Sequence, residues 1–177
     1  MYSKISWKMI QQTLKDCIEL EGTEFYGGNN VKVIIEPAKE DSGIVFSTPK
    51  GIVKADVENA RQYKSSIILE SGKARVLSVE HLLATLYAYG IDNVLINVRR
   101  IPSFGYRILG PFGTNIEVVP TLQRRERELC EKIERVGIKQ QGKERKIFRV
   151  NKKISDGKLT LEQISEGLVI SAKTNYP

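Results

Sequence analysis

The order of strand-like and helix-like segments constrains the fold of this chain more than any other feature. Short stretches rich in β-branched residues and bounded by Gly, Asn or Pro predict strands, and two longer stretches with apolar residues three or four positions apart predict helices. The predicted strands cover residues 11–20, 31–37, 43–47, 51–57, 65–69, 74–77, 94–98, 146–150, 158–161 and 168–172. The predicted helices lie within 78–90 and 120–137. This order favours an α+β fold, a two-layer sandwich in which a mostly antiparallel sheet carries helices on one face.

The first predicted helix has the clearest signals. Ser78 is placed to cap its N-terminus, which puts His81 at the third helical position, and Gly90 is placed to end it. Between them, apolar side chains recur at helical spacing and form one stripe: Leu82, Leu83, Leu86, Tyr87 and Tyr89. We therefore expect this helix to pack its stripe against the sheet.

The same pattern suggests two domains. Residues 1–137 form the expected first domain, in which residues 99–116, rich in Gly, Pro and Phe, are a long loop or insertion. The polar stretch 138–145 is typical of a linker. Residues 146–177 contain only predicted strands, so we expect a truncated second domain of strands without a covering helix.

Composition excludes several classes of protein. Of the 177 residues, 41% are hydrophobic and 28% are charged, which is ordinary for a globular chain. No stretch approaches the roughly 20 apolar residues that span a bilayer, and the N-terminus lacks the apolar core of a secretory signal, so a cytoplasmic location is expected. Two cysteines, Cys17 and Cys130, are too few for a disulfide framework or a Cys-rich zinc site.

The net charge of +7 is unevenly distributed. Residues 1–120 carry 14 basic and 13 acidic side chains, whereas residues 121–177 carry 14 and 8. A basic C-terminal third is consistent with an anionic partner, although a solvated charged surface is the more common origin of such a charge excess. The chain lacks the aromatic and glycine signature of an RNA-binding module, so nucleic acid is the least favoured partner.

Glu80 and His81 are the best candidates for chemistry. His81 is the single histidine, so any imidazole-dependent reaction must use it. At a helix N-terminus, a neutral imidazole can bind a metal ion, and the neighbouring carboxylate can accept a proton from a metal-bound water. Glu-His pairs also occur by chance, and a lone histidine near an apolar helix face is often a packed or surface residue.

Several stretches of the chain together resemble one family, the zinc-dependent UDP-3-O-acyl-N-acetylglucosamine deacetylases of lipid A synthesis. The most specific is Ser78–Ala84 (SVEHLLA) followed by Tyr89–Asn93 (YGIDN). The others are Gln11–Lys15, Gly22 with Gly27-Gly28, and Pro37-Ala38 with Gly43–Phe46. The similarity runs from about Gln11 to the C-terminus. Lys146–Val150 with Asp156-Gly157 looks like the opening of that family's second domain.

This resemblance implies a zinc amidohydrolase that removes the N-acetyl group of a UDP-acyl-glucosamine. Glu80 matches the family's general base, and His81 matches one of its three zinc ligands. The family's remaining ligands, a His and an Asp, and an assisting His lie in the second domain, and these 177 residues contain no further histidine. One protein ligand is too few for a catalytic zinc. We therefore expect weak or absent Zn²⁺ binding and negligible activity from these residues alone, unless a second chain supplies the missing domain.

The sequence departs from the family pattern in two places. Phe25-Tyr26 stands where the family has a Leu-His pair. Pro102 and Pro120 could each hold the place of the family's proline before an Asp-Gly-Ser segment, and Pro120 reproduces the length of the following helix better, which puts Gln123–Arg125 in that segment. A cationic helix start there would alter substrate handling.

Three functional interpretations remain open from sequence. The first is part of a deacetylase. The second is a non-catalytic remnant or binding module of the same fold, with an anion-binding basic region at about 121–153. The third, an unrelated nucleic-acid binder, ranks last.

Overall fold

The computed structural model describes residues 10–24, 28–101, 116–120, 126–146, 154–155 and 160–161. The chain divides into two compact units, residues 1–145 and 146–177, which are described separately. In the first unit the strands are β1 (Ile10–Leu14), β2 (Ile18–Thr23), β3 (Asn30–Pro37), β4 (Ile44–Thr48), β5 (Gly51–Lys54), β6 (Ala60–Tyr63), β7 (Ser66–Ser71), β8 (Ala74–Leu77), β9 (Val94–Arg100), β10 (Glu117–Val118) and β11 (Ile138–Glu144). The helices are α1 (Glu80–Ala88) and α2 (Glu126–Val136). This architecture confirms the predicted α+β class.

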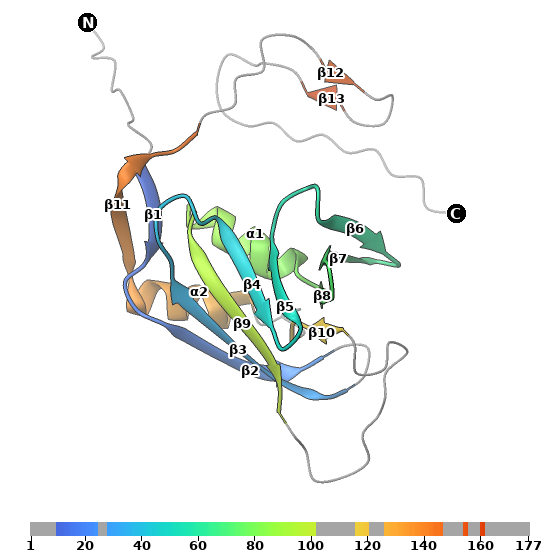
Figure 1. Ribbon diagram of the computed structural model, residues 1–177. Coiled ribbons are helices and arrows are strands. Elements are labelled where there is room, and N and C mark those ends of the chain that lie inside the picture. The colour runs from blue at the N-terminus through green and yellow to red at the C-terminus, as the bar shows by residue number, and fades with distance from the viewer. Residues whose placement is uncertain are drawn as a thin grey trace, which may run out of the picture. The chain divides into compact units, whose positions relative to one another are not determined.

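A five-stranded sheet in the order β2-β3-β9-β4-β5 forms one layer of the first unit (Figure 1). Neighbouring strands are antiparallel except β4 and β9, which run parallel. In the centre of the sheet, Val33 of β3 pairs with Leu20 of β2 and Val98 of β9. The sheet is therefore mostly antiparallel, as predicted.

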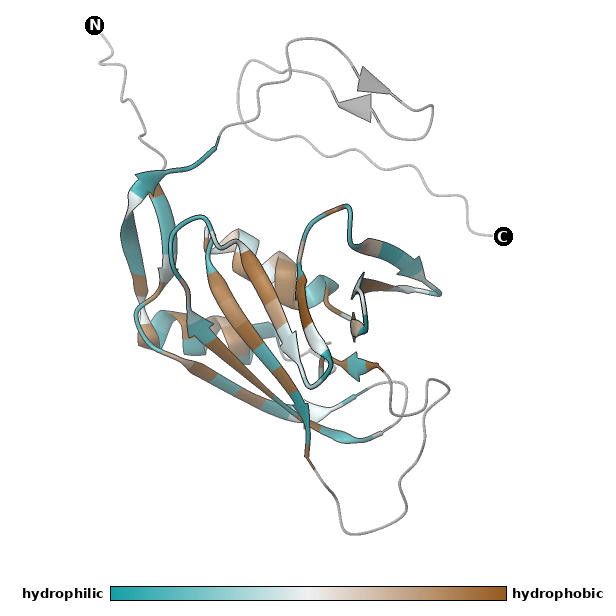
Figure 2. Cartoon of the chain, viewed as in Figure 1, coloured by the Kyte–Doolittle hydropathy of each residue, from teal (hydrophilic) through white to brown (hydrophobic). Residues whose placement is uncertain are grey.

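One face of this sheet and both helices enclose the main core. In β3, Val31, Val33 and Ile35 are buried, and the residues between them are partly exposed. Leu82 and Leu86 of α1 and Leu129 and Ile133 of α2 belong to the same buried cluster. Figure 2 shows the corresponding hydrophobic bands along β3, β9 and α1. Each such side chain stabilises the fold by about 1.5–3 kcal/mol when fully buried.

A second sheet in the order β10-β8-β7-β6 leads directly into α1. β7 and β8 form a hairpin, and β10 pairs in parallel with β8, with Glu117 opposite Val76. The sequence pattern missed β6, because its four residues are largely exposed and polar and show no alternation of apolar side chains. Likewise β5 ends at Lys54 rather than at the predicted Val57.

The polar stretch predicted as a linker is instead a strand. β11 pairs antiparallel with β1, with Leu14 opposite Ile138 and Thr13 opposite Lys139. Beyond its first residue only Gln141 is even partly buried, so hydrogen bonds rather than apolar contacts hold this strand. Hydrophobic periodicity therefore cannot detect it. The predicted strand 11–20 is also wrong as a unit, because Lys15–Cys17 separates β1 from β2.

The second unit contains one antiparallel strand pair, β12 (Ile154–Ser155) and β13 (Thr160–Leu161). The strands predicted at 146–150 and 168–172, and residues 102–115 of the predicted insertion, fall mostly or wholly outside the described residues. Arg99 and Arg100, which we assigned to that insertion, continue β9 instead. Within the described part of the chain, no helix has the length and apolar character needed to cross a membrane.

Candidate active site

The turn into α1 differs from the prediction. Val79, not Ser78, is the N-cap residue, and it makes no side-chain capping hydrogen bond. Ser78 instead adopts a left-handed conformation, with φ of 63°, which turns the chain from β8 into the helix. His81 is therefore the second helical residue rather than the third. A non-glycine residue in this conformation costs about 1–3 kcal/mol, so the turn is a strained position immediately before the candidate pair.

Glu80 is held against the neighbouring hairpin. Its Oε2 accepts a hydrogen bond from the backbone N–H of Ile67 at 3.0 Å, and the N–H of Ser78 donates to the carbonyl of Ile67 at 3.0 Å. The side chain is half-buried. The β7 strand thus fixes where the Glu80 carboxylate lies, and one of its oxygens already has a backbone partner.

His81 lies at the surface beside the second helix. Its side chain is 48% exposed, and its Nδ1 lies 3.1 Å from Oε1 of Glu126, the first residue of α2. Eight residues further along both helices, the Tyr89 hydroxyl donates to Oε1 of Glu134 at 2.7 Å. The two contacts have the same spacing on α1 and α2, so the helices run side by side in the same direction. The hydrogen bond to Glu134 also raises the pKa of the Tyr89 hydroxyl.

These residues can form one part of a zinc site. An exposed imidazole whose Nδ1 faces a carboxylate leaves Nε2 as the nitrogen for a metal ion, which is the usual arrangement of zinc-bound histidine. Among the residues that the structure describes, no group of three His, Cys, Asp or Glu side chains is placed to hold a metal. The donor set therefore fits a single zinc ligand rather than a complete site.

Glu117 of β10 is a partly buried acid beside β8, the strand that leads into α1. Its Oε2 is shielded from solvent and has no hydrogen-bond partner within the described ranges. Burial raises the pKa of the Glu117 carboxyl, and the nearby positive charge of Arg100 acts in the opposite direction. β8 therefore leads into the strained backbone position at Ser78, and its neighbour β10 carries the unsatisfied carboxylate oxygen of Glu117.

Gly90 terminates α1 at its C-terminal end, as predicted. With φ of 65°, Gly90 donates its N–H to the carbonyl of Tyr87, and the N–H of Ile91 donates to the carbonyl of Leu86. These two bonds form a Schellman motif. The next two residues, Asp92 and Asn93, then connect this helix end to three other parts of the first unit.

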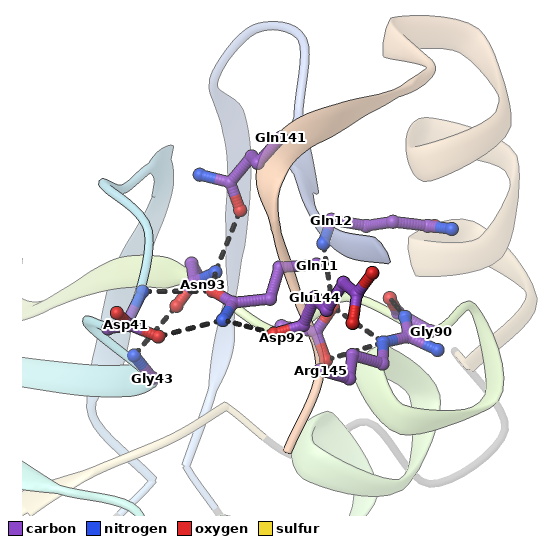
Figure 3. Close-up of polar contacts among 10 residues, drawn as sticks. All are labelled: Gln11, Gln12, Asp41, Gly43, Gly90, Asp92, Asn93, Gln141, Glu144 and Arg145. Atoms are coloured by element: carbon purple, nitrogen blue, oxygen red, sulfur yellow. Dashed lines mark hydrogen bonds and ion pairs between the residues drawn. The ribbon is translucent and has the colours of Figure 1, made fainter. Parts of the chain in front are cut away.

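Asn93 is only 1% exposed and all of its polar groups are used (Figure 3). Its Nδ2 donates to Oε1 of Gln11 at 2.9 Å and to Oε1 of Gln141 at 2.7 Å, and its Oδ1 accepts from the N–H of Gly43 at 2.9 Å. Its carbonyl accepts from the Thr13 hydroxyl at 2.6 Å. One side chain therefore joins β1, β11 and the turn before β4.

Asp92 makes a second connection. Its Oδ2 accepts from the N–H of Gln12 at 2.6 Å, and both of its carboxylate oxygens lie 2.9 Å from Nε of Arg145 (Figure 3). Arg145 also donates to the carbonyl of Gly90. We call Asp92, Asn93 and their partners the clasp. Asp92 and Asn93, the last two residues of the YGIDN motif that contributes to the family resemblance, thus have a structural role.

An open groove of about 700 Å³ lies along β1, β11 and residues 37–40. Four lysines line it, Lys15, Lys39, Lys139 and Lys143, against a single acid, Glu40. Lys143 pairs with Asp41 at 2.6 Å, which raises the pKa of the Lys143 ammonium. The other three lysines are exposed and form no ion pair with any residue that the structure describes. The groove is therefore cationic.

Sequence reasoning missed Glu126, Arg145 and the lysine groove. Glu126 is one of several glutamates in an amphipathic helix, and only the packing of α2 against α1 distinguishes it. Arg145 and two of the lysines lie on or beside β11, which the sequence pattern did not identify as a strand. Residues 121–125, which include the departure from the family's Asp-Gly-Ser segment, lie outside the described ranges, as do Phe25-Tyr26.

Comparison with known proteins points to one family. The sequence model for LpxC, the UDP-3-O-acyl N-acetylglycosamine deacetylase, matches residues 11–165. The UDP-3-O-acyl-N-acetylglucosamine deacetylase of Helicobacter hepaticus is 37% identical over 92 residues, 51% of this chain and 31% of that protein. Those of Sulfurimonas denitrificans and Aliarcobacter butzleri are each 28% identical, over 82% and 95% of this chain and 45% and 52% of theirs.

The chain therefore spans between about a third and a half of the length of these three relatives. The family match covers most of the described residues, including the whole of the Glu80–Asn93 segment and the strands on either side of it. This chain belongs to the LpxC family of UDP-3-O-acyl-N-acetylglucosamine deacetylases.

Proposed function

We propose that this chain is the first domain, with the opening of the second, of a zinc-dependent UDP-3-O-acyl-N-acetylglucosamine deacetylase. The observation that carries the proposal is the position of Glu80 and His81 at an exposed helix start inside the matched region. The first domain would comprise residues 1–145, including β11, and the second would begin at 146. A cytoplasmic location is part of the proposal.

In this proposal His81 supplies one of three zinc ligands through Nε2, and Glu80 acts as the general base at a carboxylate oxygen. Bound zinc would supply a Lewis acid that activates water for attack on the amide. The hydrogen bond from Ile67 leaves the second oxygen of Glu80 for proton transfer. The second histidine ligand must come from residues other than these 177, or from a second chain, because His81 is the sole histidine.

A polypeptide of these 177 residues is accordingly expected to bind Zn²⁺ weakly and to release no acetate. The decisive test joins this chain to a second domain that supplies the missing zinc ligands. In a chimera, this chain replaces the 174-residue matched part of the Aliarcobacter butzleri relative, and zinc content and acetate release from the UDP-acyl-glucosamine are measured.

We expect the chimera to hold one zinc ion and to release acetate, and His81→Ala to abolish both while leaving the melting temperature within a few degrees. Tyr87→Ala, an exposed change on the same helix, is the control and should keep zinc and turnover. A folded chimera that retains zinc and turnover after His81→Ala would contradict the proposal.

The lysine groove favours a second candidate function, binding of a phosphate-bearing anion. Its three lysines without ion-pair partners create a concave cationic surface of a size suited to a small phosphorylated ligand. The groove lies beside the clasp at the C-terminal end of α1, so it is separate from Glu80 and His81. This candidate corresponds to a binding module of the same fold.

Calorimetric titration with pyrophosphate tests this second candidate. Changing Lys15, Lys39 and Lys139 together to Ala should weaken binding at least 10-fold. The same triple change at Lys54, Lys64 and Lys73, exposed residues outside the groove, alters the net charge equally and should have little effect. Equal losses in both variants would show that binding follows net charge alone, and the candidate would be rejected.

A further inference from the structure

Glu126 faces His81 from a helix whose position is fixed by other contacts. Leu129 and Ile133 bury α2 in the main core, and the Tyr89 hydroxyl holds Glu134 two turns beyond Glu126. These contacts set the register of α2 against α1. Glu126 therefore reaches Nδ1 of His81 because the packing of the two helices places it there.

We propose that Glu126 is a positioning residue that accepts the Nδ1–H of His81 and so fixes both the tautomer and the orientation of the imidazole. With the proton on Nδ1, the lone pair of Nε2 is directed outward. Histidines that bind zinc commonly donate their other ring N–H to a carboxylate, which also makes the ligating nitrogen more basic. That this orientation serves zinc binding rests on the proposed function, but the contact between Glu126 and His81 itself does not require a metal.

The surroundings of the pair favour a positioning role over a stabilising one. The side chains are 48% and 39% exposed, and an ion pair at that exposure contributes little to folding. Glu126 also begins α2, where a negative charge interacts favourably with the helix dipole. The carboxylate is therefore accommodated at this position independently of His81, whereas the imidazole gains a fixed orientation from it.

A tautomer measurement on the full chain tests the proposal directly. Because His81 is the single histidine, its ring nitrogens give the only histidine side-chain signals, and they need no assignment. Long-range ¹H–¹⁵N spectra are recorded in the absence of metal, at a pH where the ¹⁵N shifts show the ring to be neutral. We expect the Nδ1–H tautomer to dominate, and Glu126→Ala to shift the population to Nε2–H.

Glu134→Ala is the matched control, because it removes another polar contact between the two helical segments, the Tyr89–Glu134 hydrogen bond, without touching His81. It should leave the tautomer unchanged. A dominant Nε2–H form in the unmodified chain, an unchanged tautomer in Glu126→Ala, or equal shifts in both variants would each overturn the proposal.

A second readout uses the chimera. There, Glu126→Ala should weaken zinc affinity about 10–100-fold, and Glu134→Ala should not. Affinity equal to that of the unmodified chimera after Glu126→Ala would also overturn the proposal. Because the tautomer is read without metal or a second domain, a chimera that never binds zinc would count against the proposed function and leave the tautomer result intact.

Discussion

The two ends of α1 differ in how deeply their polar residues are buried and in how fully those residues are hydrogen-bonded. At the C-terminal end, Asn93 is buried and every polar group of its side chain has a partner, and Asp92 is joined to Arg145. At the N-terminal end, His81 is half exposed and Ser78 has a strained backbone. The helix between them has only nine residues, about 13 Å.

This difference indicates a division of roles within one short motif. A buried and satisfied polar network specifies how loops and strands join, and it has no free group with which to act on a ligand. Exposed titratable groups next to a strained turn contribute little to stability and are available for chemistry. The clasp therefore holds α1 in place so that its other end presents Glu80 and His81 at a defined position.

The largest expected effect is loss of the clasp. Asn93→Ala removes one acceptor and two donor bonds and leaves the N–H of Gly43 and the oxygens of Gln11 and Gln141 without that partner. We expect a loss of about 3 kcal/mol in the free energy of unfolding, measured by urea denaturation.

Asn59→Ala is the control for this change. Asn59 donates to the carbonyl of Lys54 at an exposed site, and its loss should cost below about 1 kcal/mol. Equal costs for the two variants would mean that the clasp has no special role in stability.

The second effect concerns the ion pair of the clasp. Arg145→Ala removes the charged partner of Asp92 and the side-chain donor to the Gly90 carbonyl, at a site where both charged side chains are mostly buried. We expect a loss of about 1–2 kcal/mol in thermal or urea unfolding. Arg127→Ala removes an exposed pair with Glu131 and should change stability by less than about 0.5 kcal/mol. A reversed order would contradict the comparison.

The strained turn predicts a gain in stability. Ser78→Gly removes the cost of the positive φ and should stabilise the chain by about 0.5–1 kcal/mol. The same substitution at Ser47, inside β4, should destabilise it by a similar amount, because glycine weakens a strand. Destabilisation by Ser78→Gly would show that the Ser78 side chain contributes more than its backbone costs.

The smallest effect depends on pH. Burial raises the pKa of Glu117 in the folded state, so the folded chain binds more protons than the unfolded chain and becomes less stable as pH rises above the ordinary glutamate range. Glu117→Gln should therefore be more stable than the unmodified chain at pH 7, and the difference should shrink towards pH 4. Urea denaturation at several pH values measures this, and a difference independent of pH would contradict it.

The sequence predicted the parts of the fold that depend on buried apolar side chains. The β-branched stretches of β3 and β9 and the stripe Leu82, Leu86 correspond to the core that the structure shows. Tyr87 was wrongly placed in that stripe, because it is 80% exposed. Gly90 was correctly placed as the helix end, since the αL turn after a helix favours glycine strongly.

The parts that could not be predicted depend on contacts between distant segments. β11 is a polar strand that exists because β1 offers it a hydrogen-bonding edge. The pairing of His81 with Glu126 spans 45 residues and follows from how α2 packs. Ser78 is of a residue type that favours N-cap positions, but it adopts a left-handed conformation in the turn between β8 and α1, and Val79 is the N-cap instead.

One measurement tests the division of roles most directly. In the chimera, Glu80→Gln keeps an acceptor for the Ile67 N–H, whereas Asn93→Ala disrupts the clasp, and turnover per folded molecule and melting temperature are recorded for both. We predict that Glu80→Gln lowers acetate release about 10²–10⁴-fold with an unchanged melting temperature. We predict that Asn93→Ala lowers the melting temperature and retains turnover below it. Full turnover after Glu80→Gln would contradict the assignment of chemistry to the N-terminal end of α1.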